Sequence, residues 1–110
     1  MNTEPTKRIW LNGTFDVVHL GHIKLFQHAK TLYPTSIVCV GVDTDKRIRQ
    51  LKGPNRPLNP LNFRVEFLKA IRFIDQVVTF STDRGLCREI ALFNPDVMLI
   101  GDDYRNRTIV

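Results

Sequence analysis

The stretch GTFDVVHLGH, residues 13–22, separates two segments with different hydrophobic patterns. Before it, residues 8–12 (RIWLN) form a short apolar run that is compatible with a β-strand. After it, residues 22–33 carry a single apolar stripe at helical spacing, and Pro34 ends the pattern. Residues 13–22 therefore predict a strand-to-helix turn that contains glycines and two histidines.

The rest of the chain continues the alternation of strand and helix. Residues 36–42 (SIVCVGV) are a continuous β-branched apolar run, which is typical of a strand covered on both faces. Residues 46–62 hold three prolines and one glycine and predict mostly loop, with a helical turn near 47–51. The other expected elements are a helix at 63–74 with Phe67, Leu68, Ile71 and Ile74 on one face, a strand at 77–80, a helix from an N-cap at Thr82 or Asp83 to residue 93, and a strand at 97–100.

This order predicts an α/β fold, because strands that alternate with helices pair in parallel through right-handed crossovers. We expect a single domain, residues 1–110, with a doubly wound parallel sheet in a three-layer α/β/α arrangement. In such sheets a ligand binds beyond the carboxyl ends of the strands. Three segments should meet there, namely residues 12–22, 43–56 and 101–104.

Composition is that of an ordinary soluble protein, with 43% hydrophobic and 25% charged residues. No apolar run approaches the roughly 20 residues that a membrane-spanning helix needs. The polar N-terminus lacks the apolar segment of a signal peptide. We therefore expect a cytoplasmic protein without a membrane partner, in which Cys39 and Cys87 are free thiols.

Charge is unevenly distributed around the net value of +5. Residues 46–65 contain no acidic residue. A block of this kind forms a solvated face or a surface for phosphate or nucleic acid. Nucleic acid is the weakest of these readings, because no aromatic residues are interleaved with the bases to form a stacking platform. The six basic residues are Lys46, Arg47, Arg49, Lys52, Arg56 and Arg64.

The two histidines lie where the predicted helix begins. A helix N-terminus presents N–H groups and partial positive charge, which suit a phosphate. His19 and His22 could donate hydrogen bonds to phosphate oxygens and stabilise transition-state charge, while Gly21 leaves room for a ligand to approach the backbone. Two other readings stay open. The pair could bind a metal with Asp16 as the one local third ligand, or His19 could be a buried structural residue.

GTFDVVHLGH resembles the G-T-F-D-x-x-H-x-G-H signature of the cytidylyltransferase-like nucleotidyltransferases, and the resemblance covers nearly the whole chain. Residues 13–30, 71–77 (IRFIDQV) and 101–104 (GDDY) are similar to glycerol-3-phosphate cytidylyltransferase. Residues 42–71 and 94–104 are similar to the heptose-1-phosphate adenylyltransferase branch. The resemblance implies a Rossmann-like fold. It also implies an enzyme that joins CTP or ATP to a phosphorylated alcohol or sugar and releases pyrophosphate.

The resemblance also implies roles for individual residues. Asp16 would be structural and would orient the turn or a histidine, and Lys46 or Arg56 could substitute for Lys52. An exposed salt bridge is the alternative role for Arg64. The resemblance further implies Mg²⁺ carried by the NTP, no resident metal, and a homodimer. The expected catalytic residues are His19, His22, Lys52 and Arg64; the nucleotide-binding residues are Gly13, Thr14, Phe15, His19, Gly21, His22, Asp102 and Asp103; the acceptor-binding residues are Asp43, Asp45, Lys52 and Arg56.

One feature departs from the family pattern. Family members have a further strand and a later R-T-x-x-[IV]-S-T-T-like segment that also holds the triphosphate, whereas this sequence ends RNRTIV. We therefore expect the last strand and helix to be lacking and the domain to be truncated at its C-terminus. The chain could be a fragment, could be completed by a second subunit, or could be an inactive nucleotide-binding or assembly domain.

Overall fold

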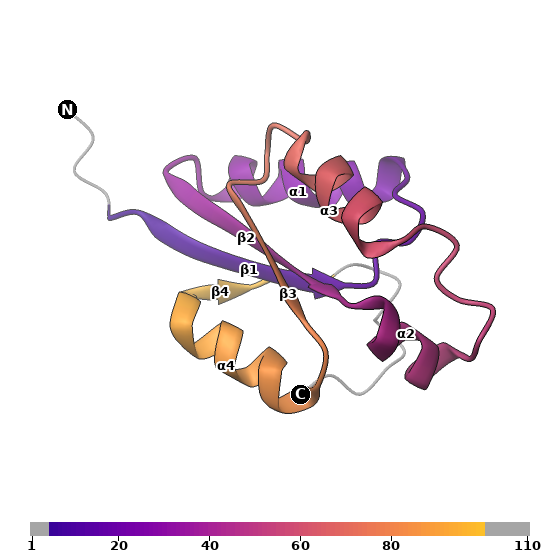
Figure 1. The fold of residues 1–110 in the computed structure, drawn as a ribbon. Coiled ribbons are helices and arrows are strands. Elements are labelled where there is room, and N and C mark those ends of the chain that lie inside the picture. Colours follow the sequence, from indigo (N-terminus) through magenta and orange to yellow (C-terminus); the bar gives the residue numbers. More distant parts are fainter. Residues whose placement is uncertain (1–4, 101–110) are drawn as a thin grey trace.

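The computed structural model describes residues 5–100 and contains a four-stranded parallel sheet (Figure 1). The strand order is β3-β2-β1-β4, so the chain winds outward from β1 in both directions. This arrangement confirms the doubly wound α/β fold. The elements in chain order are β1 (Lys7–Gly13), α1 (Leu20–Leu32), β2 (Ser36–Asp43), α2 (Asp45–Lys52), α3 (Leu61–Lys69), β3 (Gln76–Phe80), α4 (Asp83–Phe93) and β4 (Val97–Met98).

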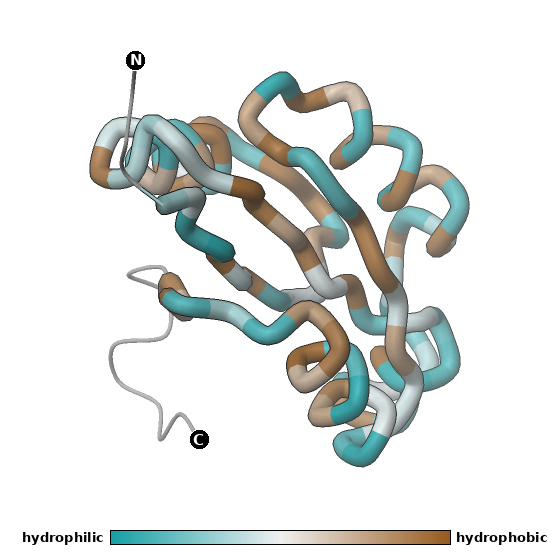
Figure 2. The backbone as a smooth tube through the Cα atoms, turned by 90° about the vertical axis from the view of Figure 1, so that its left-hand side faces the viewer, coloured by the Kyte–Doolittle hydropathy of each residue, from teal (hydrophilic) through white to brown (hydrophobic). Residues whose placement is uncertain are grey.

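Helices cover both faces of the sheet, with α1 and α3 on one side and α4 on the other (Figure 1). Successive side chains of a strand point to opposite faces. Ile9 and Leu11 of β1 consequently pack in the cluster that contains Phe26 of α1, whereas Trp10 packs with Phe93 of α4. Hydrophobic stretches follow the strands through the middle of the molecule in Figure 2. Burial on both faces explains the continuous apolar runs in the sequence.

Gly41 in β2 allows the indole of Trp10 to lie against the backbone. A Cβ at this position would lie 2.6 Å from Cζ2 and 2.8 Å from Cη2 of Trp10. Both residues are buried, so the ring has little room to move. We expect Gly41→Ala to lower the free energy of unfolding by roughly 1–3 kcal/mol, the usual cost of overpacking a core. Urea unfolding measures this loss, and an unchanged midpoint would contradict the packing described.

Residues 46–62 divide as the sequence indicated, with helix first and loop after it, but the helix α2 (Asp45–Lys52) is longer than the expected turn near 47–51. The Thr44 hydroxyl caps this helix by accepting the N–H of Arg47 at 3.3 Å. Ile48 is its buried anchor, and Gly53 ends it with a φ of 97°. The prolines that suggested a loop all follow Gly53, so they shape only the second part of the segment.

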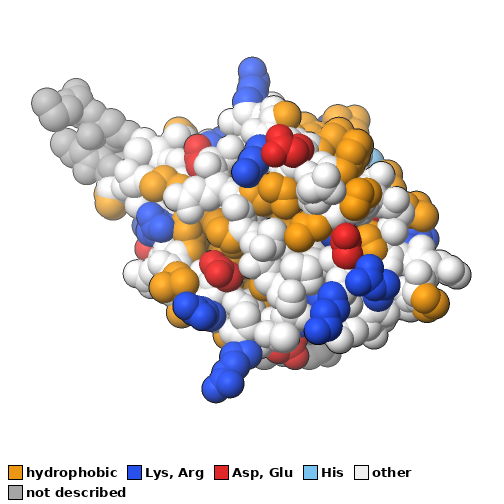
Figure 3. All heavy atoms as spheres, in the orientation of Figure 1, with side chains coloured by type: hydrophobic (Ala, Val, Ile, Leu, Met, Phe, Trp, Pro, Cys, Tyr) orange, Lys and Arg blue, Asp and Glu red, His pale blue; other side chains and the backbone are white. Residues whose placement is uncertain are grey.

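Helix α3 begins and ends earlier than the expected 63–74. Leu68 and Ile74 are buried as expected, but Phe67 is 47% exposed, so its assignment to the buried face is wrong. The helix stops at Lys69, and Ile74 reaches the core from the turn that follows. Phe63 is also exposed, and hydrophobic side chains gather over α3 in Figure 3.

Strand β4 is shorter than the expected 97–100, and its register partners in β1 are Ile9 for Val97 and Trp10 for Met98. The backbone N–H groups of Asp96 and Leu99, on either side of it, donate to the β1 carbonyls of Arg8 and Trp10. Met98 is 48% exposed and Ile100 is 49% exposed, so the strand is not covered on both faces. The predicted loss of a further strand and helix concerns residues outside the described range and stays a prediction. Within residues 5–100, no helix has the length and apolarity needed to cross a membrane.

Candidate functional site at the carboxyl edge of the sheet

The ends of β1 and β2 bring two of the three expected segments together. Gly13 and Val42 are register partners, so the residues after each strand are neighbours. The Thr14 hydroxyl lies 3.4 Å from Oδ2 of Asp43. The third segment, which includes Asp102 and Asp103, lies outside the described residues, and these two assignments stay predictions.

Phe15 fixes the turn after β1. Its φ of 49° lies in the left-handed region, where a bulky residue is strained, yet its side chain is buried. The ring packs at 5.8 Å from the ring of Phe26 and meets the ring of His22 edge-on at 5.4 Å. Strain of this kind persists only where the surroundings impose it, and it is common at functional sites. Phe15 thus anchors the turn in the core, and its ring packs against the ring of His22.

His19 and His22 lie together at the N-terminus of α1, with ring centroids 4.0 Å apart. His19 is the N-cap residue, and its Nδ1 accepts the N–H of Gly21 at 3.1 Å. Nδ1 of His22 accepts the N–H of His19 at 3.1 Å. His19 is exposed, so the reading of it as a buried structural histidine is wrong.

The absence of a side chain at Gly21 also matters for the neighbouring histidine. A Cβ at Gly21 would lie 2.8 Å from Cε1 and 3.0 Å from Nδ1 of His19. The glycine therefore makes room for the His19 ring. Its predicted contact with nucleotide remains untested by this geometry.

Asp16 has the structural role that was expected, and it orients a loop rather than a histidine. Its two carboxylate oxygens accept the N–H groups of Leu58 and Asn59, each at 2.8 Å. The Asn59 side-chain amide donates to the backbone carbonyl of Asp16. These three bonds fasten the loop before α3 to the turn after β1. Arg56 adds a longer ion pair to Asp16 at 3.8 Å.

These hydrogen bonds also shift the pKa of Asp16. Burial by itself would raise the pKa of Asp16. The amide N–H groups of Leu58 and Asn59, followed by the charges of Arg64 and Arg56, nevertheless hold this pKa below its ordinary value of 3.8. A carboxyl whose pKa is lowered by folding stabilises the folded state above its unfolded pKa. That stabilisation is lost as the pH falls through the lower, folded-state pKa.

We therefore expect Asp16→Asn to lower the free energy of unfolding by roughly 1–3 kcal/mol at neutral pH, because an amide leaves one backbone N–H facing a donor. The difference from the wild type should shrink as the pH falls below 3.8. Urea unfolding of both proteins across this range measures it. Glu66→Gln is the control, since Glu66 is an exposed carboxylate on α3. A difference that stays constant with pH would contradict the role of the charged carboxylate.

Arg64 is buried and joins the turn after β1, the end of β2 with the start of α2, and the loop before α3. Its Nη1 donates to the backbone carbonyls of Thr14 at 2.9 Å and Asp43 at 2.8 Å. Its Nε donates to the carbonyl of Asn59 at 3.0 Å, and Nη2 pairs with Oδ1 of Asp45 at 2.6 Å. The side chain of Arg64 is 0% exposed, so the alternative of an exposed salt bridge is wrong. These contacts position the loops, and the expected catalytic role of Arg64 stays a prediction.

The carboxylates expected to bind the acceptor are held in ion pairs. Asp45 pairs with Arg64, and Oδ1 of Asp43 lies 2.8 Å from Nε of Arg47. Arg47 also reaches Oδ1 of Asp83 at 2.7 Å, which ties α2 to the start of α4. Thr44 and Ser81 add a hydroxyl contact of 2.8 Å between the same segments. The acceptor-binding roles of Asp43 and Asp45 stay predictions.

The structure divides the basic block into two groups. Arg47 and Arg64 are committed to carboxylates of the protein. The other four are exposed and lie on α2 or in the loop that follows it, where they could meet anionic ligands. These four residues are Lys46, Arg49, Lys52 and Arg56.

Other chemistry is not assembled among the described residues. Within residues 5–100, no group of three histidine, cysteine or carboxylate side chains could hold a metal ion. Burial raises the pKa of Cys39 to about 11, so this thiol remains protonated.

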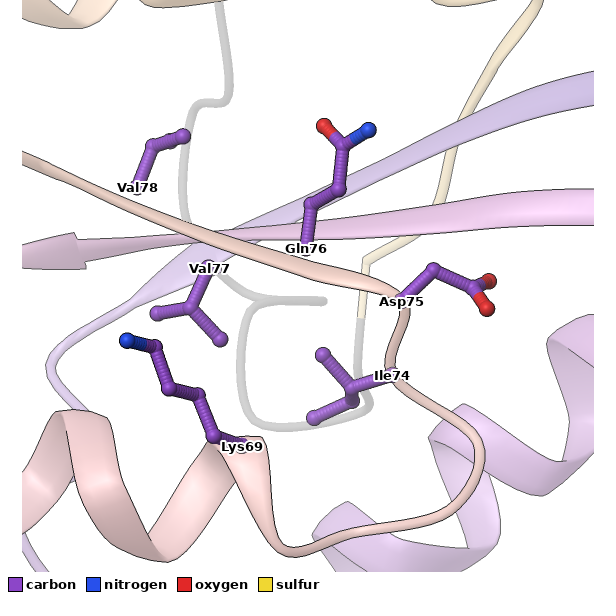
Figure 4. Close-up of a pocket in the computed structure, with 6 residues that line it drawn as sticks. All are labelled: Lys69, Ile74, Asp75, Gln76, Val77 and Val78. Carbon is purple, nitrogen blue, oxygen red and sulfur yellow. The ribbon is translucent and has the colours of Figure 1, made fainter.

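A hollow of about 400 Å³ lies beside the outer strand β3 and is lined by Lys69, Ile74, Asp75, Gln76, Val77 and Val78. Figure 4 shows it at the start of β3, away from the carboxyl edge.

A parallel doubly wound sheet with polar loops gathered beyond its carboxyl edge defines a Rossmann-like α/β domain. The chain belongs to the cytidylyltransferase-like family, whose model matches residues 10–108. This membership confirms the family expected from the sequence.

Similar proteins include the bifunctional protein HldE of a Nitratiruptor species, which is 37% identical over 102 residues. The bifunctional protein HldE of Campylobacter jejuni is 38% identical over 104 residues. These matches cover 93% and 94% of this chain but only 21% and 22% of the relatives, so the chain spans about a fifth of their length.

A solved structure supports the fold. The lipopolysaccharide core biosynthesis protein from Thermoplasma volcanium superposes with a TM-score of 0.78. The sequence identity is 22%, and the match covers 94% of this chain and 80% of that protein.

Proposed function

We propose that this domain transfers a nucleotidyl group from CTP or ATP to a phosphorylated small alcohol or sugar and releases pyrophosphate. The observation that carries the proposal is the pair of histidines at the N-terminus of α1, directly after β1. Membership of the cytidylyltransferase-like family supports it. The imidazoles can donate to phosphate oxygens, and the partial positive charge of the helix N-terminus favours anions, at the edge where such sheets bind ligands.

The reaction is a direct displacement at phosphorus. An oxygen of the acceptor's phosphate attacks the α-phosphorus of the NTP, a new P–O bond forms, and the bond to the β-phosphate breaks. The acceptor is already anionic, so no side chain has to remove a proton. The work left to the protein is to hold two anionic substrates in line and to neutralise charge that grows on their oxygens. Mg²⁺ enters as part of the NTP substrate.

Two groups of residues divide this work. His19 and His22 donate to the triphosphate oxygens from the start of α1. Lys52 and Arg56, which are exposed at the end of α2 and beyond it, attract the phosphorylated acceptor, and Lys46 can substitute for Lys52. Arg64 holds the two loops at the spacing that the displacement requires, through the carbonyls of Thr14 and Asp43.

Labelled nucleotides test the reaction and its regiochemistry. In parallel reactions, NTP labelled at the α-phosphorus or at the γ-phosphorus is incubated with Mg²⁺ and either glycerol 3-phosphate or a heptose 1-phosphate, using CTP and ATP in turn. We expect the α-label in a nucleotidyl product and a γ-label in pyrophosphate. Label from the γ-position in the acceptor would contradict attack at the α-phosphorus. NTP binding without any product would instead identify an inactive nucleotide-binding domain.

A further inference from the structure

We propose that residues 19–22 form a capping box built from two imidazoles, which fixes both His19 and His22 as the Nε2–H tautomer. The same contacts that begin helix α1 would then set the two rings as hydrogen-bond donors. The inference rests on the proposed function only for the identity of the acceptor, which is a phosphate oxygen. The tautomers themselves follow from contacts within the chain.

One hydrogen bond determines the tautomer of His19. Its Nδ1 accepts the backbone N–H of Gly21 at 3.1 Å. A backbone N–H can only donate, so the nitrogen that receives it carries no proton. A neutral imidazole with an unprotonated Nδ1 has its proton on Nε2. The donor of His19 is therefore Nε2–H.

The tautomer of His22 is determined in the same way, by a hydrogen bond that runs from the N-cap residue back to the helix. Its Nδ1 accepts the backbone N–H of His19 at 3.1 Å. The two bonds form the reciprocal capping box of α1, in which the N-cap and the third helical residue each receive a backbone N–H. Such boxes ordinarily use a hydroxyl and a carboxylate or amide. Here imidazoles replace both, and each retains an Nε2–H that the cap does not use.

Two neighbours hold the rings in this arrangement. The absence of a side chain at Gly21 leaves the space that the His19 ring occupies, because a Cβ there would approach Cε1 to 2.8 Å. The buried ring of Phe15 meets His22 edge-on at 5.4 Å, with an interplanar angle of 65°. The capping box thus accounts for both histidines and for the glycine between them, independently of any ligand.

The tautomers can be measured directly by NMR without substrate. Long-range ¹H–¹⁵N correlation on the whole chain, with ¹⁵N-labelled histidine at slightly alkaline pH, distinguishes protonated from unprotonated ring nitrogens. We expect His19 and His22 to show an unprotonated Nδ1 and a protonated Nε2. His28, exposed further along α1, serves as the internal reference. An Nδ1–H tautomer, or an equal mixture, at either His19 or His22 would overturn the proposal.

Three substitutions at His19 separate the cap from the donor. The side-chain oxygen of His19→Asn reproduces the position of Nδ1, whereas the amide of His19→Gln reaches toward the position of Nε2. We expect the Asn variant to keep the wild-type midpoint of thermal unfolding, while His19→Ala and His19→Gln lower it. Equal midpoints for the Asn and Ala variants would overturn the capping role.

Activity then reports on the donor alone. If the wild type transfers nucleotide, His19→Asn should lose turnover by roughly 10²–10³-fold despite its intact cap. The Gln variant should retain more turnover than the Asn variant, and the reverse order would contradict donation from Nε2. If the wild type shows no turnover, the proposed function fails, while the NMR and unfolding results still decide the tautomers and the cap.

Discussion

Replacing His22 with alanine is expected to slow nucleotidyl transfer by roughly 10²–10³-fold, the loss that follows removal of one preorganised donor to transition-state charge. His22 also receives the N–H of His19 and packs against Phe15. Loss of the cap should lower the free energy of unfolding by only about 0.5–2 kcal/mol, so the protein remains folded. Turnover at saturating substrate and urea unfolding of the same preparation measure the two effects.

His28→Ala is the matched control for this prediction. His28 lies on the same helix and is exposed, and it is remote from the capping box in sequence. We expect this variant to keep wild-type turnover. A His22→Ala protein that also keeps full turnover would remove His22 from the mechanism. Equal losses in both variants would mean that helix stability, rather than donation to phosphate, sets the rate.

Replacing Arg64 with methionine is expected to have the largest effect on stability. Methionine keeps much of the apolar stem but leaves the carboxylate of Asp45 without its partner, together with the carbonyls of Thr14, Asp43 and Asn59. Asp45 is 32% exposed and stays partly solvated, so most of the cost comes from the three carbonyls left without a donor. At roughly 1–3 kcal/mol for each unsatisfied group, we expect a loss of at least about 3 kcal/mol. This is a large part of the roughly 5–15 kcal/mol that stabilises a typical domain. Urea unfolding measures the loss.

Two further variants serve as comparisons for this prediction. Arg64→Lys retains the charge, but one ammonium group cannot reach acceptors that the planar guanidinium spans, so we expect an intermediate loss. Arg56→Ala removes a half-exposed arginine whose ion pair with Asp16 is 3.8 Å long, and it should cost at most about 1 kcal/mol. Similar losses for Arg56→Ala and Arg64→Met would contradict the central position of Arg64.

The sequence predicted the fold well because its strands carry clear signals. β1 and β2 are buried on both faces, and this burial leaves continuous apolar runs that are visible without a structure. Helix α2 was expected only as a turn near 47–51, because half of its residues are basic and only Ile48 is buried, so periodicity gave little signal for its full length. Phe67 was misplaced because apolar spacing alone cannot show that α3 leaves part of that face uncovered.

The site was predicted in part. The glycines, the two histidines and the end of β2 could be located from strand order, since parallel strands end at one edge. The connections between the loops could not be predicted. Asn59 was overlooked between two prolines, and the buried position of Arg64 depends on carbonyls that are distant in the sequence. Long-range bonds from a side chain to the backbone leave no periodic pattern.

Pyrophosphate release by the purified chain is the most direct measurement of the proposed function. The chain is supplied with Mg²⁺ and CTP or ATP, with and without glycerol 3-phosphate or a heptose 1-phosphate. We predict release that requires both the nucleotide and one phosphorylated acceptor, and that falls in the His22→Ala variant. No release from any pair by a folded chain, or release that is independent of the acceptor, would contradict nucleotidyl transfer by this domain.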